Sequence, residues 1–161
     1  MGSECIFLQW AQGSIEHGRK MHSDPVSPVF TWPVRVYWED TDAGGVVYHA
    51  SYVRFLERAR SEWLRARGIA QQRVRDEQGV LFVVRDMSLE FVAAARLDDE
   101  LDVTIETFER RSASLAFVQC ILRRADGVLL TRARVRAACI DAVTWQPRRI
   151  PENLLQENQS A

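Results

Sequence analysis

A helical pattern of apolar residues occupies the middle of the chain. Between about Ala50 and Arg67, apolar side chains recur every three or four residues, which places them on one face of an α-helix. Gly68 follows as a predicted C-terminal stop. The segment is therefore predicted to be one long amphipathic helix, whose apolar face consists of Tyr52, Phe55, Leu56, Ala59, Trp63 and Ala66.

Alternating apolar and polar residues predict strands on both sides of this helix. Residues 34–38 are rich in β-branched and aromatic side chains, and after Gly79 a period of two continues to residue 141. The turn Ala125-Asp126-Gly127 predicts a hairpin between the last two strands. Residues 70–78 are expected to form a short polar helix or turn. In the last strand, Ala133, Val135, Ala137 and Cys139 are predicted to face the core, and Arg132, Arg134 and Arg136 to face away.

The order of these elements predicts an α+β fold. One strand, one long helix and four further strands suit a curved antiparallel five-stranded sheet wrapped around one long central helix. A single helix leaves the other sheet face and the sheet edges available for a second copy of the chain. A homodimer or homotetramer is therefore expected.

The two ends of the chain show weaker patterns. Residues 1–32 have no sustained period, so they are expected to be an irregular, poorly ordered N-terminal extension. The folded domain is expected to span residues 33–150, and residues 151–161 suit a short terminal helix or a frayed tail. Met21 is a hypothetical start of the folded protein, since the pattern becomes organised only after it.

Composition narrows the class of protein. A chain of 161 residues suits one domain, and a net charge of −1 argues against a general electrostatic grip on nucleic acid. No apolar run reaches the roughly 18 residues of a membrane span. The chain has three cysteines and three histidines, which makes a structural zinc site improbable. The odd number of cysteines fits a reducing cytoplasm; they are Cys5, Cys120 and Cys139.

The loop before the long helix carries the candidate chemistry. Asp40 and Asp42 stand two residues apart, and each has a structural reading as a helix cap or Asx turn. Gly44-Gly45 allows close backbone approach to a ligand. At the helix start, near His49, free N–H groups can bind a carbonyl oxygen and the negative charge that develops on it. A nearby carboxylate can then act as general base for water or attack the carbonyl itself.

Residues 34–59, with the sequence VRVYWEDTDAGGVVYHASYVRFLERA, resemble the 4-hydroxybenzoyl-CoA-thioesterase-type hotdog enzymes. The resemblance is closer to the acyl-CoA thioesterases associated with the bacterial Tol-Pal system. It continues more weakly through residues 94–101 and the last two strands. The resemblance implies a hotdog fold, hydrolysis of an acyl thioester, active sites at the interface between subunits, and no metal or cofactor.

The same resemblance implies roles for individual residues. Asp42, the second acid of the D-x-D motif, is implied to be catalytic, and His49 to supply the backbone N–H that polarises the thioester carbonyl. Gly45 and Tyr48 match positions that shape the substrate pocket, and Val46 belongs to its apolar wall.

Glu57 is a less favoured catalytic acid, because a second branch of hotdog thioesterases places its acid on the central helix. Its structural reading is a surface pair with Arg54, Arg60 or Ser61.

The sequence leaves open the carrier of the thioester and two alternatives to hydrolysis. The implied substrate is an acyl-CoA or an acyl-carrier-protein thioester, with acyl carrier protein as a possible partner. Arg123-Arg124 and Arg148-Arg149 are candidate phosphate contacts, or else solvated surface arginines. The alternatives to hydrolysis are a hotdog dehydratase or hydratase, in which His49 and Glu57 would act as a pair, and a non-catalytic acyl-thioester-binding module.

Overall fold

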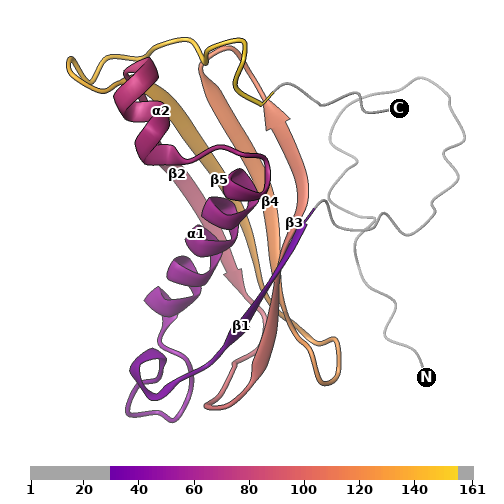
Figure 1. Cartoon of the computed structure of the whole chain (residues 1–161). Coiled ribbons are helices and arrows are strands. Elements are labelled where there is room, and N and C mark those ends of the chain that lie inside the picture. The colour runs from indigo at the N-terminus through magenta and orange to yellow at the C-terminus, as the bar shows by residue number, and fades with distance from the viewer. Residues whose placement is uncertain (1–29, 156–161) are drawn as a thin grey trace, which may run out of the picture.

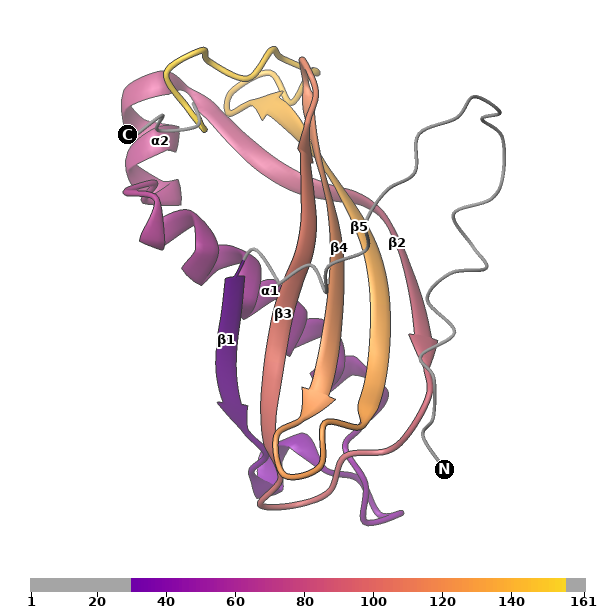
Figure 2. The same ribbon diagram turned by 90° about the vertical axis from the view of Figure 1, so that its right-hand side faces the viewer.

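The computed structural model of the chain describes residues 30–155, in which five antiparallel strands form one curved sheet (Figure 1). Helix α1 (His49–Ala66) lies along one face of the sheet, and the shorter α2 (Gln71–Gln78) follows it. The strands run in the order β1-β3-β4-β5-β2, so β1 and β2 form the two edges (Figure 2). Their bounds are β1 (Phe30–Arg35), β2 (Val80–Phe91), β3 (Glu100–Arg110), β4 (Ser114–Arg123) and β5 (Leu129–Asp141). The predicted fold is confirmed.

The first strand differs from the prediction in its position. It spans Phe30–Arg35 rather than residues 34–38, and Trp38 lies in a short 3-10 helix, η1 (Trp38–Asp40). The sequence shows no sustained period before residue 33, so the prediction began the domain at residue 33 and the strand at Val34. Strand β1 is an edge strand, where a missing N–H is tolerated, and Phe30 pairs with Ile105 of β3. The strand therefore begins before the predicted boundary, and the hypothesis about Met21 concerns residues outside the described range.

Helix α1 has the predicted core-facing side. Tyr52, Phe55, Leu56, Ala59 and Trp63 are buried, and only Ala66, at the helix end, is exposed. The Trp63 ring packs against the rings of Phe108 and Phe117 from the sheet, with centroids 4.5 and 5.5 Å away. Gly68 adopts a positive φ of 74° just past the helix, as a C-terminal stop requires.

The last two strands also follow the predicted pattern. Gly127 has a positive φ of 69° in the turn between them, and the four small residues of β5 predicted to face the core are buried. Arg134 and Arg136 are exposed on the opposite face. Beyond β5, residues 151–155 form turns rather than a helix, and Leu154 is buried, so this part of the tail packs on the domain instead of fraying.

Helix α1 covers only part of the concave face. Its backbone lies nearest β1 and β3, and α2 contacts the beginning of β2, at the far edge. At the other end of β2, the Phe91 ring packs against the Tyr52 ring of α1, with centroids 5.5 Å apart. Val84 and Phe91 of β2 are nevertheless 49% and 53% exposed. The apolar surface near β2 is therefore a feature of the folded domain that the chain itself leaves uncovered.

In the described residues no helix is long and apolar enough to cross a membrane.

A buried polar contact fixes α1 on the sheet. The Arg60 guanidinium donates to Gln119 Oε1 at 2.8 Å, and Gln119 Nε2 donates to the Leu56 carbonyl at 3.1 Å. Burial lowers the pKa of Arg60, and the charge of Glu57 raises it. If Gln119 were removed, the Arg60 guanidinium and the Leu56 carbonyl would each lose a partner. Because Gln119 is fully buried, water could not replace it.

We expect Gln119→Ala to lower the free energy of unfolding by about 2–3 kcal/mol, because it leaves the buried Arg60 guanidinium without its acceptor. Urea unfolding followed by circular dichroism measures the change. Gln72→Ala is the matched control, since Gln72 is exposed and bonds only Asp76 on its own helix; it should change stability by no more than about 0.5 kcal/mol. Equal effects of the two variants would contradict this account.

Candidate active site

The segment between β1 and α1 folds into a small hairpin. Thr41 and Val47 form an antiparallel bridge, and the Asp42 N–H donates to the Val46 carbonyl at 3.0 Å. The Gly45 N–H donates back to the Asp42 carbonyl at 3.0 Å, which closes a tight turn. Gly45 has a φ of 73°, the left-handed conformation that ends a three-residue hairpin loop. The two glycines therefore serve a turn that presents Asp42 at its beginning.

The Asp42 carboxylate is partly engaged and largely open. Its Oδ1 accepts a hydrogen bond from the Gly44 N–H at 2.8 Å, so the structural reading as an Asx turn is correct. Its Oδ2 has no hydrogen-bond partner among the described residues, and the side chain is exposed. A Cβ on Gly44 would lie 3.0 Å from Oδ1, so an alanine at this position would make the Asp42 carboxylate shift by a few tenths of an ångström. The turn orients the carboxylate without consuming both of its oxygens.

Asp40 is in the opposite situation. Only 3% of it is exposed, and its Oδ2 accepts from the Tyr37 N–H at 3.0 Å. Its Oδ1 accepts from Arg54 on α1 at 3.3 Å. Both carboxylate oxygens are therefore occupied by groups of the protein. Of the two acids that the sequence could not separate by residue type, only Asp42 has an oxygen left for a ligand.

The start of α1 supplies hydrogen-bond donors beside this turn. The Tyr48 N–H is used by the Asp40 carbonyl at 2.8 Å, and the helix begins at His49. No side chain of the described residues caps the helix, and its first turn contains no acid. The first N–H groups of an α-helix have no partner within the helix. A ligand oxygen at this end can therefore accept hydrogen bonds from the backbone near His49 and Ala50, strengthened by the helix dipole.

The two aromatic side chains at the helix start lie together on the surface. The rings of Tyr48 and His49 are 4.3 Å apart between centroids and tilted by 51°. Tyr48 is 45% exposed, and Val46 is half-buried beside it in the hairpin. The hairpin and the helix start that follows it thus carry the predicted residues Asp42, Gly45, Val46, Tyr48 and His49, and both ring side chains are exposed.

Glu57 does not join this group. It lies eight residues beyond His49, about 12 Å along the helix axis, and its Oε1 accepts from Ser61 Oγ at 2.7 Å. The structural reading of Glu57 as a surface residue bonded to its own helix is the one observed. Within one chain, His49 and Glu57 are too far apart to act on the same proton.

Most of the candidate phosphate contacts are already neutralised. Arg123 pairs with Asp99 and Asp126, and Arg124 with Asp102 and Glu100. Arg148 pairs with Asp141, and Arg149 is exposed. Arg123, Arg124 and Arg148 are therefore engaged in ion pairs within the domain.

The described residues contain no group of three or more His, Cys, Asp or Glu side chains that could hold a metal ion.

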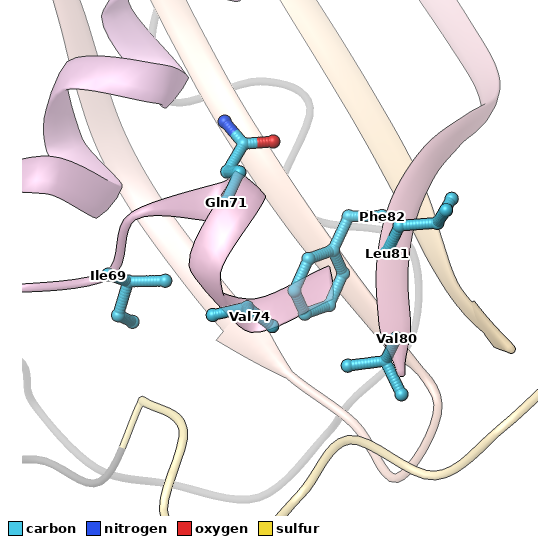
Figure 3. A pocket seen from close by; sticks show the side chains of 6 residues that line it. All are labelled: Ile69, Gln71, Val74, Val80, Leu81 and Phe82. Carbon is cyan, nitrogen blue, oxygen red and sulfur yellow. The ribbon is translucent and has the colours of Figure 1, made fainter. Parts of the chain in front are cut away.

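A small cavity lies at the other end of α1, between α2 and β2 (Figure 3). Its volume is about 40 Å³, and helix α1, with 18 residues and about 27 Å in length, separates it from the Asp42 turn. The lining contains no ionisable group, so it offers no acid–base chemistry; it consists of Ile69, Gln71, Val74, Val80, Leu81 and Phe82.

Sequence reasoning missed a third segment beside the site, the connection between β2 and β3. The Ala95 carbonyl accepts from the Val47 N–H at 2.9 Å, and the Ala95 N–H donates to the Tyr52 hydroxyl at 2.9 Å. Burial raises the pKa of Tyr52, while the bond from Ala95 opposes that shift. These contacts use the backbone of an alanine, which has no side-chain signature. The weak family resemblance of residues 94–101 was the available signal.

Comparison with known proteins finds a family and relatives that match most of the chain. A family model described as "Thioesterase-like superfamily" matches residues 36–157. The "Acyl-CoA thioester hydrolase YbgC" of Escherichia coli O6:H1 is 50% identical over 129 residues, covering 80% of this chain and 95% of that protein. The "Acyl-CoA thioesterase YbgC" of Haemophilus influenzae is 44% identical, covering 78% of this chain and 90% of that protein.

A solved structure supports the fold. The crystal structure of Slr0204, a 1,4-dihydroxy-2-naphthoyl-CoA thioesterase from Synechocystis, matches with a TM-score of 0.71 and 25% identity. The match covers 76% of this chain and 89% of that one. The resemblance predicted from residues 34–59 is confirmed, and it extends over most of the described domain.

Proposed function

The chain belongs to the thioesterase-like superfamily, and from this membership we propose that Asp42 and the start of α1 carry out its reaction, the hydrolysis of an acyl-CoA thioester. The products are the free acid and the thiol of coenzyme A. One observation carries the assignment of residues: the turn that orients Asp42 leaves one of its carboxylate oxygens without a partner among the described residues, in the hairpin that leads into the uncapped start of α1. No other acid of the D-x-D motif is available, because Asp40 is buried and fully bonded.

Backbone N–H groups at the helix start polarise the thioester carbonyl in this proposal. As the carbonyl carbon becomes tetrahedral, negative charge collects on its oxygen, and donors fixed by the helix stabilise that charge. These groups belong to His49 and Ala50, whose geometry is set by the helix rather than by side-chain rotamers. Tyr48 and Val46 form the apolar wall against which the acyl group packs.

Asp42 supplies the second half of the reaction. As a general base it takes a proton from water while the water oxygen attacks the carbonyl carbon, and the carbon–sulfur bond then breaks to release the thiolate. As a nucleophile its free oxygen attacks directly, the thiolate leaves, and water hydrolyses the resulting anhydride. Both routes need one unpaired carboxylate oxygen on the side of the carbonyl, which Asp42 Oδ2 provides.

We propose that two copies of the chain pair to complete the site. Asp42 is exposed in a single chain, whereas fixed donors act most strongly where water is excluded. The β2 edge is 12 residues long and carries the exposed apolar side chains Val84 and Phe91, which suit pairing with another strand. Acyl carrier protein as the thiol carrier, a tetramer built from such pairs, and a cytoplasmic location remain predictions.

Asp42→Asn should lower kcat for acyl-CoA hydrolysis by about 10²–10⁴-fold, because an amide cannot accept the proton or attack efficiently. Release of free thiol from acyl-CoAs of graded chain length measures the rate. Glu57→Gln is the matched control and should keep most of the activity, since Glu57 is exposed and accepts a hydrogen bond from Ser61 on its own helix. Similar mild losses in both variants would overturn the assignment, and tight binding of acyl-CoA by the unaltered chain without turnover would favour a binding module.

Gly44→Ala should lower kcat at least several-fold with little loss of stability, because the added Cβ presses on Asp42 Oδ1. Gly68→Ala should instead lower the stability of the protein and leave kcat unchanged. Its φ of 74° strains an alanine by about 1 kcal/mol, yet it lies at the far end of α1 with open space around it. Thermal unfolding and thiol release on both variants test the contrast, and an unchanged kcat in Gly44→Ala would contradict the role of this turn.

Val84→Glu should convert the proposed dimer into monomers and lower kcat by at least tenfold, because it places a charge beside the β2 edge. Sedimentation velocity and thiol release on the same samples measure both effects. Val143→Glu is the control, since Val143 is 86% exposed in the turn after β5; it should leave mass and rate unchanged. A monomeric, fully active unaltered chain would refute the shared site.

A further inference from the structure

We propose that Asp40 is a positioning residue for thioester hydrolysis, which fixes the Asp42 turn relative to the donors at the start of α1. This inference rests on the proposed function. Asp40 does not touch the substrate in this scheme, because it is 3% exposed and both its carboxylate oxygens are occupied. Its effect passes through the elements that it holds together.

The Asp40 side chain joins two elements. Oδ2 accepts from the Tyr37 N–H at 3.0 Å, at the point where the chain leaves β1 and enters η1. Oδ1 accepts from Arg54 Nη2 at 3.3 Å, and the same guanidinium nitrogen donates to Ser51 Oγ at 2.8 Å. Arg54 and Ser51 both belong to the first turns of α1. One carboxylate therefore connects the entry to the site with the helix.

The Asp40 backbone carbonyl completes the connection. It accepts from the Tyr48 N–H at 2.8 Å and from Ser51 Oγ at 3.1 Å. Tyr48 is the residue immediately before α1, so this bond sets where the helix begins. Ser51 is fully buried and contacts Asp40 through its hydroxyl while Arg54 donates to that same oxygen. Side chain and backbone of Asp40 thus act on the same helix end.

Asp42 lies two residues farther along the same arm of the hairpin. In an extended ladder, two residues correspond to about 7 Å, so a tilt of the arm at Asp40 moves the Asp42 carboxylate relative to the helix donors. A misplacement of about 1 Å can reduce a reaction rate on the order of a hundredfold. Substrate affinity depends less on this spacing, because the acyl group packs on Tyr48 and Val46. The expected signature is a loss in kcat with little change in binding.

Asp40→Asn tests the inference. The amide oxygen can still accept from the Tyr37 N–H, whereas the charge that pairs with Arg54 is lost. We expect kcat to fall by about 10–100-fold, while KM and the affinity for a non-hydrolysable acyl-CoA thioether change less than about twofold. Glu39→Gln is the matched control, since it removes the neighbouring exposed acid of η1; it should keep the kcat of the unaltered chain.

The outcomes separate this inference from the proposed function. An Asp40→Asn protein with unchanged kcat overturns the positioning role while leaving hydrolysis by Asp42 intact. The inference is also overturned if kcat and the fraction of protein that binds the thioether fall by the same factor. Such equal losses indicate partial unfolding rather than misalignment. If the unaltered chain and Glu39→Gln hydrolyse no acyl-CoA of the panel, the proposed function itself fails, and the inference that rests on it fails with it.

Arg54→Met decides the question if Asp40→Asn does not fold. The Arg54 side chain is 52% exposed, so its replacement keeps the buried carboxylate and its bond from Tyr37. Kcat should fall several-fold with thioether affinity retained, and an unchanged kcat overturns the inference. Where both variants fold, a protein with both Asp40→Asn and Arg54→Met should have a kcat no lower than that of Asp40→Asn alone. The reason is that the two residues act through one contact.

Discussion

The hydrogen bond from the Tyr48 N–H to the Asp40 carbonyl is the contact on which the candidate site depends. It closes the hairpin between β1 and α1 and determines that the helix begins at His49. Because this bond uses the Tyr48 donor, the next N–H groups along the chain are the first that can serve a ligand. The same closure sets the Asp42 turn on the adjacent arm. In the proposed site, the base and the oxyanion donors would therefore come from one local backbone arrangement.

The two acids of this loop show how environment assigns different roles to identical side chains. Asp40 accepts from the Tyr37 N–H and the Arg54 guanidinium and is shielded from water. Asp42 accepts one bond, from Gly44, and remains exposed. A buried carboxylate must be fully paired to be tolerated, whereas an exposed one can keep an open oxygen because water solvates it until substrate arrives. In the proposed mechanism, the structural and the reactive requirement are therefore met by different residues.

Sequence periodicity predicted what depends on local geometry. The buried side of α1 and the alternation in β5 follow directly from the repeats of helix and strand, so both were readable. The start of β1 was misplaced because residues 1–32 show no sustained period, and only the sheet order reveals that the strand lies at an edge. Asp42 was preferred over Asp40 through family resemblance alone. The physical difference between them depends on Arg54 and Tyr37, contacts that no local pattern encodes.

The concave face of the sheet explains why the site of one chain is open. Helix α1 lies nearest β1 and β3, and although its Tyr52 ring contacts Phe91, both Val84 and Phe91 of β2 stay about half exposed. The donors at the helix start would stabilise an oxyanion only weakly in contact with bulk water, since electrostatic stabilisation grows as water is removed. A second chain at the β2 edge would bury apolar surface and exclude water near the Asp42 turn in the same step. Association and catalysis are then one requirement, because the area that drives pairing is also the area that encloses the reaction.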